Sequence, residues 1–418
     1  MTATSYALGI DVGTTSTAAA VQRAGKAVMF LLGSRGATIP SLVFLRDDQA
    51  ILTGEAAERR GIVEPTRLAR DLKRHVGASG PIMLGPAPFS AQRLLAALLE
   101  EVVATVTARE GGPPDHVVVT HPANWDPAKI DLLRHALDLA GLRSVTLLAE
   151  PLAVAVHYAA HPRRLAPGST LAVYDLGGGT FDAVVLRWTG LAFETLGEPQ
   201  GIDRLGGIDV DEAVFAHVGD ALHGALDQLD GGDPSVRVAI GRLRRECVGA
   251  KEALSVDAET TIPVALPNVH TDVRMTRAEL ESRIRPAIAE TVEALVRAVA
   301  SAALGPDGPD AVLLVGGSSG IPLVAQMVTS ALGRPVATDV HPKHAVALGA
   351  ALAVAGASTT TSTTSISPTP SPPLSDPPAG GGGARGGPGR AAEAPALPGQ
   401  ALPPAAVTGN GGCVDLPT

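Results

Sequence analysis

The chain has few of the residues that mark secreted, disulfide-stabilised proteins. Its 418 residues include only two cysteines, Cys247 and Cys413, which cannot form a disulfide framework and do not lie at metal-binding spacing. Aromatic residues make up only 3% of the sequence, so the core must depend on alanine, valine and leucine. These features predict a protein of a reducing compartment, and we expect it to be cytoplasmic.

Positive charge and long apolar runs are also scarce. The formal net charge is -9, which argues against a protein that binds the phosphate backbone of nucleic acids. The longest mildly apolar stretch, Ala345–Gly356, is too short to cross a bilayer. The first residues lack the basic and apolar regions of a secretory signal. We therefore expect no nucleic-acid partner, no membrane span and no secretory signal.

Length and composition divide the chain into a large folded part and a tail. With 418 residues, 45% of them hydrophobic, the chain can support more than one lobe. After Gly356 the composition changes to Ser, Thr and Pro, then Gly, then Ala and Pro. Such a segment has too few large apolar side chains to offset the entropy cost of ordering. The sequence predicts a folded part over 1–356 and a disordered tail over 357–418.

Strand-like and helix-like segments alternate through the folded part. The strand-like runs are apolar and read "YALGIDV", "HVVVT", "SVTLLA", "LAVYDLG", "FDAVVLRW" and "DAVLLVGG". Helices are expected over Ala91–Arg109, Pro127–Ala140, Asp211–Leu229 and Thr276–Leu304. The last of these opens with a capping box, and its Pro286 is expected to kink or break it. The alternation predicts an α/β fold.

One short pattern occurs twice, as "YALGIDVGTTSTAAAVQ" (Tyr6–Gln22) and "LAVYDLGGGTFDAVVLR" (Leu171–Arg187). In each, an aspartate ends an apolar run and a Gly- and Thr-rich turn follows it. Such turns present backbone N–H groups that suit phosphate oxygens. Asp11 and Asp175 would repel phosphate unless a divalent cation lay between them, which predicts Mg²⁺ held in part through water. Two facing loops of this kind would clamp a polyphosphate from both sides.

Two further glycine turns each precede a predicted helix. They lie in "VLLVGGSSGIP" (Val312–Pro322) and in "RLGGIDVDEAV", which contains Gly206 and Gly207. Helix N-termini and glycine turns suit the phosphate or the sugar of a nucleotide. Together with the paired loops, these turns favour a nucleotide as the ligand.

These motifs and their order resemble one known family. The matching stretches are "GIDVGTT", "DLKRHVG", "EPLAVAVHYA", "YDLGGGTFD", "RLGGIDVD", "AKEALS", "LLVGGSSGIP" and "HPKHAVALGAA". From Tyr6 to Gly356 the chain resembles the actin-like ATPase domain of the DnaK-type 70-kDa heat-shock chaperones. The resemblance implies two lobes, about 1–170 and 171–356, each with a duplicated ribonuclease-H-like core subdomain and a smaller outer one. It also implies ATP or ADP with Mg²⁺ in the cleft between them, and allows K⁺ as a second cation.

The resemblance assigns roles to individual residues. It implies a catalytic set that neutralises the γ-phosphate and orients water, consisting of Lys73, Glu150, Asp175 and Asp182. It places the metal beside Asp11 and Asp175, and a switch proline at Pro151. The implied phosphate contacts are Gly13, Thr14, Thr15, Gly178, Gly179, Thr180 and Gly207. The implied adenosine contacts are Lys251, Ser255, Gly317 and Ser318.

The adenine side departs from the family pattern. Glu252 and Gly320 stand where well-studied members have arginines that stack on adenine, and Val248 replaces a glutamate. Lys343 stands where an aspartate is frequent. Because a guanidinium on an aromatic face contributes about 1 kcal/mol, its loss predicts weaker or less selective binding of adenine.

The sequence leaves several functions open. After Gly356 we find neither the apolar-acidic linker nor the strand pattern of a peptide-binding domain. The favoured hypothesis is a slow ATPase switch that lacks its own peptide-binding domain and works with client proteins and a nucleotide-exchange factor. The alternative is a nucleotide-binding regulator or scaffold with little turnover. A sugar kinase and a filament-forming actin-like protein are less favoured readings of the same fold.

Overall fold

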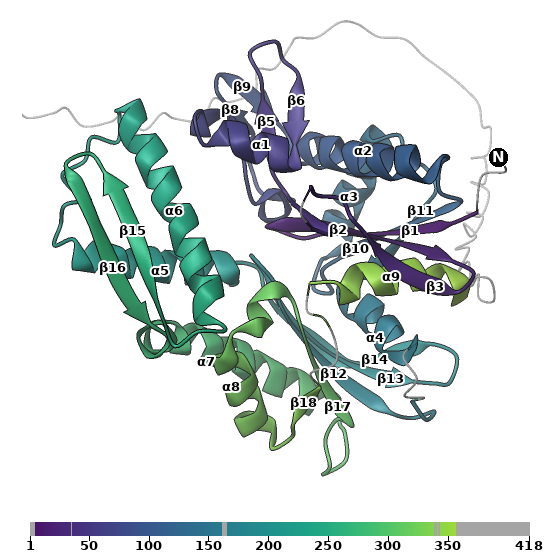
Figure 1. Ribbon diagram of the computed structural model, residues 1–418. Helices are drawn as coiled ribbons and strands as arrows, with labels where there is room; N and C mark the ends of the chain where they lie inside the picture. The colour runs from purple at the N-terminus through teal and green to yellow at the C-terminus, as the bar shows by residue number, and fades with distance from the viewer. Residues whose placement is uncertain (1–4, 35, 161–164, 338–340, 342, 357–418) are drawn as a thin grey trace, which may run out of the picture. The chain divides into compact units, whose positions relative to one another are not determined.

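The computed structural model describes residues 5–34, 36–160, 165–337, 341 and 343–356. These residues lie within one compact unit, residues 1–362. The predicted disordered tail, 357–418, lies outside the described residues. The α/β class expected from the alternating pattern is confirmed (Figure 1).

The first sheet has the strand order β11-β10-β1-β2-β3, with β4 paired to β2. Its central strand β1 is antiparallel to β2 and parallel to β10, and β10 is parallel to β11. The strands are β1 (Ala7–Val12), β2 (Ser16–Arg23), β3 (Lys26–Phe30), β4 (Thr38–Pro40), β10 (His116–His121) and β11 (Val145–Ala149).

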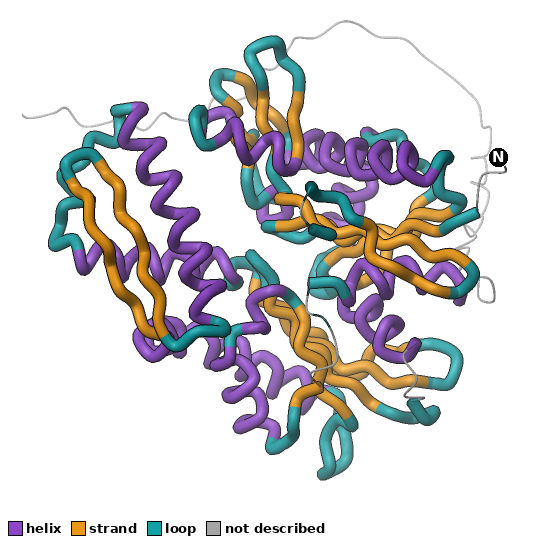
Figure 2. The backbone as a smooth tube through the Cα atoms, in the orientation of Figure 1, coloured by secondary structure: helices purple, strands orange, loops and turns teal. Residues whose placement is uncertain are grey.

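The second sheet repeats this arrangement, with the order β14-β13-β12-β17-β18. Its central strand β12 is antiparallel to β13 and parallel to β17, and β17 is parallel to β18. The strands are β12 (Thr170–Leu176), β13 (Phe181–Trp188), β14 (Phe193–Ile202), β17 (Ala311–Val315) and β18 (Val336–Ala337). In Figure 2 each sheet forms a separate group of orange strands. The two halves of the chain therefore share one topology.

The helices that connect these strands also repeat. In the first half a helix precedes β10, another joins β10 to β11, and a third follows β11; in the second half the same places occur around β17 and β18. The first set is α2 (Ala91–Glu110), α3 (Pro127–Leu139) and α4 (Glu150–Ala160). The second set is α7 (Arg277–Ser301), α8 (Pro322–Leu332) and α9 (Ala345–Gly356).

Each sheet carries an insertion between its third strand and the next core helix. The first insertion contains β5 (Val43–Leu45), β6 (Ile51–Thr53), α1 (Gly54–Gly61), η1 (Pro65–Arg67), β7 (Leu68–Ala69), η2 (Leu72–His75), β8 (Ile82–Leu84) and β9 (Ala87–Phe89). The second contains α5 (Gly207–Ala221), α6 (Pro234–Leu254), β15 (Glu259–Leu266) and β16 (Val269–Thr276). Below, the first sheet with its insertion and helices α2 and α3 is called the first lobe. The second sheet with its insertion and helices α7 and α8 is called the second lobe.

Two helices connect the lobes. Helix α9 packs on β1, β2 and β10 of the first sheet, although it comes last among the described elements. It also packs along α4, which in turn contacts β12 and β13 of the second sheet (Figure 1). A Cβ added at Gly349 of α9 would overlap the carbonyl of Ala153 in α4, so the two helices meet at backbone distance.

One helical expectation is wrong in its bounds, and another is wrong in part. The helix expected over Asp211–Leu229 begins earlier, at Gly207, and ends at Ala221, because His223 and Gly224 take left-handed backbone angles with φ of 50° and 85°. Pro286 does not break its helix, since α7 runs through it without interruption. The capping box at Thr276 and a buried apolar face on both sides of the exposed proline keep α7 on the second sheet.

Among the helices of the described residues, none is both long enough and apolar enough to cross a bilayer.

Candidate functional site

The two glycine turns have the same backbone geometry. Gly13 N donates to Ser16 O at 3.0 Å, and Gly177 N donates to Thr180 O at 3.0 Å. Asp11 and Asp175 stand two residues before these turns, on the central strand of each sheet. The repeated sequence pattern thus corresponds to a repeated structural element.

The two turns lie against each other. A Cβ added at Gly178 would overlap the Thr15 side chain, and a Cβ added at Gly179 would overlap Thr14. Gly178 and Gly179 therefore allow an approach that any larger residue would prevent. Thr14 is buried, whereas Thr15 is exposed and Thr180 is half-buried.

Neighbouring residues brace each turn. At the first, the buried Ser41 donates from Oγ to Gly13 O at 2.8 Å, and its N–H donates to Thr15 O. At the second, Gly207 N donates to Gly177 O at 3.0 Å, and Ser318 Oγ donates to the same carbonyl at 2.8 Å. Because these carbonyls are engaged by the protein, the turns can hold a fixed shape.

Lys73 and Glu150 form a buried ion pair beside the turns. Lys73 comes from η2 and Glu150 from the first turn of α4, and their side chains are only 6% and 8% exposed. Burial alone would lower the pKa of Lys73, but the Glu150 and Asp11 carboxylates outweigh it and raise that pKa above its usual value. Lys73 is therefore a fixed cation. Pro151, the expected switch proline, is the buried residue that follows Glu150 in α4.

Three aspartates share this environment. Burial, together with the charge of Glu150, raises the pKa of Asp11 and of Asp182 to about 7. The same causes raise the pKa of Asp175 well above its ordinary range, with the charge of Asp182 contributing as well. Asp175 and Asp182 stand opposite each other in the β12–β13 register, where the first hairpin has Asp11 opposite Ala18. The site holds more carboxylate than its lysine neutralises.

The donor set fits a divalent cation with water in its shell. Asp182 Oδ1 is buried and has no hydrogen-bond partner among the described residues, and such an orphaned oxygen suits water or a cation. Within the described part of the chain, no three His, Cys, Asp or Glu side chains converge as a ready metal site. A cation here would therefore need phosphate and water oxygens besides the aspartates, as Mg²⁺ accepts.

The residues expected to contact adenosine lie next to the second glycine turn. Lys251 Nζ lies 2.7 Å from Asp211 Oδ1 and 3.3 Å from Gly207 O. Lys251 Nζ and Ser318 Oγ both lie beside the Cα of Gly207. Ser255, at the end of α6, donates from Oγ to Lys251 O at 3.2 Å.

The departures from the family pattern meet at the same place. Lys343 Nζ lies 3.3 Å from Glu252 Oε1, although the two residues are 91 positions apart. The Lys343 stem also lies beside the exposed Gly317. Glu252 and Lys343, two of the residues that depart from the family pattern, thus form one ion pair.

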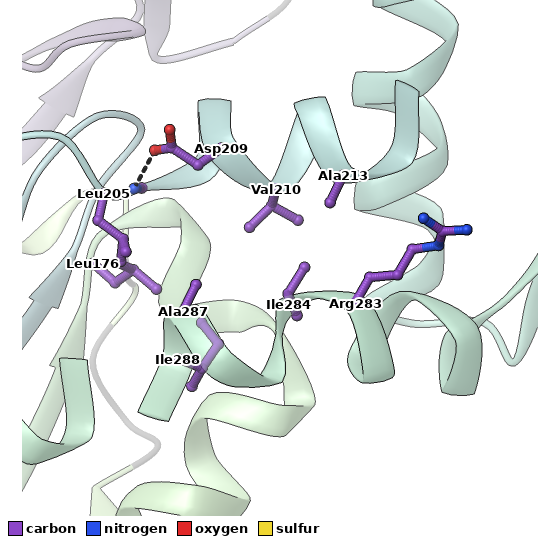
Figure 3. Close-up of a pocket in the computed structure, with 10 residues that line it drawn as sticks. Leu176, Leu205, Asp209, Val210, Ala213, Arg283, Ile284, Ala287 and Ile288 are labelled. Carbon is purple, nitrogen blue, oxygen red and sulfur yellow. Dashed lines mark hydrogen bonds between the residues drawn. The ribbon is translucent and has the colours of Figure 1, made fainter. Parts of the chain in front are cut away.

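A small apolar pocket of about 80 Å³ lies next to the site, between α5 and α7. Figure 3 shows Val210 and Ala213 of α5 facing Ile284 and Ile288 of α7, with Arg283 farther along. No motif in the sequence indicates this pocket, because its walls come from segments that are far apart in the chain.

Other supporting residues were also missed from the sequence. They are Ser41, which braces the first turn; Thr120, whose Oγ1 donates to Asp11 Oδ1 at 3.2 Å; and Arg74 with Asp209, which join the lobes. Arg74 directly follows Lys73 in the stretch "DLKRHVG", so the sequence pointed to this segment but could not predict the partners of Arg74.

Comparison with known families agrees with this geometry. The sequence matches the family described as Hsp70 protein over residues 7–83 and 81–375, most of the chain. The paired sheets, their two insertions and the facing glycine turns are the actin-like ATPase architecture that the motifs implied. The chain therefore belongs to the Hsp70 family and carries its actin-like, chaperone-type ATPase domain.

Proposed function

We propose that this domain binds ATP with Mg²⁺ between the two glycine turns and hydrolyses it slowly, as a conformational switch. The observation that carries the proposal is the buried Lys73–Glu150 pair, set beside Asp11, Asp175 and Asp182 at the matched turns. A structural role alone would not require so many buried charges, since ionised groups are costly to bury.

The turns hold the triphosphate in this proposal. Backbone N–H groups of Thr14 and Thr15 on one side, and of Gly178, Gly179 and Thr180 on the other, bind phosphate oxygens. Gly13, whose N–H donates to Ser16 O, shapes the first turn and lets the phosphate approach it. When bound, Mg²⁺ beside Asp11 and Asp175 neutralises phosphate charge and keeps both carboxylates ionised. Lys73 Nζ supplies a second, permanent positive charge near the terminal phosphate.

The remaining acids act on the attacking water. Glu150 fixes Lys73 and orients the water through its other oxygen. The buried Asp182 Oδ1, which has no hydrogen-bond partner among the described residues, accepts a proton from that water. Hydrolysis in this arrangement relies on positioning and charge, as phosphoryl transfer generally does.

The nucleoside lies over the second lobe in this proposal. Gly207, Lys251, Ser255, Gly317 and Ser318 contact the sugar and base. Glu252 and Gly320 stand at the positions of the two stacking arginines, and Glu252 pairs instead with Lys343 next to Gly317, so we expect weak selection between purine bases. We further propose that a client protein and a nucleotide-exchange factor act on the switch.

Single-turnover hydrolysis tests the proposal. The full chain is mixed with ATP or GTP, with Mg²⁺ or with chelator, and nucleotide binding is measured in parallel. Lys73→Ala should lower the hydrolysis rate at least about 100-fold while nucleotide binding changes much less, because Lys73 acts mainly on developing charge. Lys26→Ala, an exposed lysine on β3, is the matched control and should hydrolyse at the wild-type rate.

Each outcome decides between functions. Metal-dependent hydrolysis that Lys73→Ala abolishes supports the ATPase switch. Tight nucleotide binding without turnover would instead favour a nucleotide-gated regulator or scaffold. If Lys73→Ala hydrolysed as fast as Lys26→Ala, the role given to Lys73 would be wrong.

A further inference from the structure

Arg74 connects the two lobes directly. Its Nε donates to Gly179 O at 2.7 Å, and its Nη2 donates to Asp209 Oδ2 at 2.9 Å. Both acceptors belong to the second lobe, while Arg74 belongs to the first. The Arg74 side chain is 15% exposed, so this charged hydrogen bond is better shielded than an ordinary surface ion pair.

The partners of Arg74 are part of the second glycine turn and its support. Asp209 Oδ2 also accepts from Gly206 N at 2.8 Å (Figure 3). The next residues, Gly207 and Ile208, donate from their N–H groups to Gly177 O and Gly178 O. Arg74 therefore holds the turn at Gly179 and also holds, through Asp209, the segment that braces it.

Arg74 is also the residue after Lys73 in the single turn η2. The turn is closed by hydrogen bonds from Arg74 N to Asp71 O at 2.9 Å and from Val76 N to Lys73 O at 3.3 Å. Leu72 and Lys73 are buried, and Asp71 takes a left-handed φ of 54° that a non-glycine residue rarely adopts. In so short and constrained a turn, a displacement of Arg74 would also displace Lys73.

We propose that Arg74 is a positioning residue, which makes the placement of Lys73 depend on contact between the lobes. When the second glycine turn is held against the first lobe, Arg74 fixes η2 and Lys73 reaches Glu150. When that turn moves away, Arg74 loses both acceptors and η2 is released. The inference rests on the proposed ATPase function for its kinetic consequence, but the mechanical coupling is separate from turnover.

A second contact between the lobes provides a matched control. Lys129 Nζ, on α3, lies 2.9 Å from Asp203 Oδ2, and Asn124 Nδ2 donates to Asp203 Oδ1 at 3.0 Å. Asp203 directly follows β14 in the second lobe, whereas the stem of Lys129 lies beside Gly77, next to η2. Asp203→Ala therefore removes this contact between the lobes and leaves the Lys129 stem in place beside the segment that carries Lys73.

The kinetic test compares Arg74→Ala, Arg74→Lys and Asp203→Ala in the full chain. Arg74→Ala should lower the single-turnover rate at saturating ATP by about tenfold and speed the release of a fluorescent ADP analogue. Asp203→Ala should speed release but leave the single-turnover rate within about twofold of wild type. Arg74→Lys should lie between, because an ammonium cannot donate to both acceptors in the fork geometry of arginine.

Hydrogen exchange tests the coupling without relying on activity. Arg74→Ala should speed amide exchange in both 177–180 and 71–76, whereas Asp203→Ala should leave 71–76 at the wild-type rate. Wild-type exchange at 71–76 in Arg74→Ala, or an equal loss of turnover in Asp203→Ala, would overturn the proposal. A wild-type chain that does not hydrolyse ATP would contradict the proposed function, while the exchange data would still decide the coupling.

Discussion

At Asp11 and Asp182, burial works against the charge that the proposed chemistry needs. Both carboxyls have a pKa of about 7, because they have lost water and stand near Glu150. A cation in the site would return them to their ionised form. Without one, the folded protein holds protons that the unfolded chain has already released.

This difference predicts how stability depends on pH. Between about pH 4 and pH 7 the metal-free folded state binds more protons than the unfolded state, since the ordinary pKa of aspartate is 3.8. The free energy of unfolding should therefore fall as pH rises through this window, and level off above it. Thermal melting in chelator from pH 5 to pH 8 measures the slope, and Asp182→Asn should reduce it. An equal slope in Asp182→Asn would show that other groups cause the dependence.

At the scale of single elements, helix α7 depends on its N-cap residue, Thr276. Thr276 Oγ1 accepts from Glu279 N at 3.3 Å, and Glu279 Oε2 accepts from Thr276 N at 2.7 Å, which completes the capping box. Because α7 supports the second sheet, a loss at its cap affects the whole lobe.

Thr276→Ala should destabilise the protein by about 1 kcal/mol, because it removes the side-chain acceptor for the first turn. Thr276→Ser keeps the hydroxyl and should lose only a small part of this. Urea unfolding of both variants measures the difference. Equal stability of the alanine and serine variants would mean that the cap contributes nothing.

Elements were predictable from sequence where local signals agreed. Strand β13 was expected over Phe181–Trp188, as found, because an apolar run is bounded by clear turns. The end of α5 was not predicted correctly. Apolar residues continue for a short run after Ala221, but the left-handed backbone at His223 and Gly224 ends the helix before them. Pro286 does not break its helix because the packing that holds the buried face of α7 on the second sheet is tertiary.

At the scale of the whole molecule, the sequence predicted the duplication but not the contacts between the two lobes. Two copies of an Asp-Gly pattern indicated two similar halves, and apart from β4 the strands of the two sheets follow the same order. Gly179 and Asp209, the hydrogen-bond partners of Arg74, lie 105 and 135 positions away from it in the sequence. No periodicity in the sequence predicts pairs so far apart. The residues proposed for chemistry came from motifs, whereas those that hold the lobes together came from the structure.

The close contact of α4 with α9 predicts a large effect at one glycine. Gly349→Ala should destabilise the protein by about 1–3 kcal/mol or more, because the added methyl group meets backbone of Ala153 and forces the helices apart. Gly241→Ala, in helix α6 with open space around it, is the matched control and should stabilise by about 0.5–1 kcal/mol. Chemical unfolding measures both. Similar signs for the two variants would contradict this packing.

The position of α9 has a consequence for how the chain is made. One face of the first sheet buries Ala18 and Ala20 against Ala347 and Ala351, which are more than 300 residues later. A ribosome therefore releases nearly the whole described chain before the earliest strands can be covered. Until then that face stays open to other apolar surfaces, as in other large proteins that complete their cores late. The first lobe is thus synthesised first, but its core is completed last.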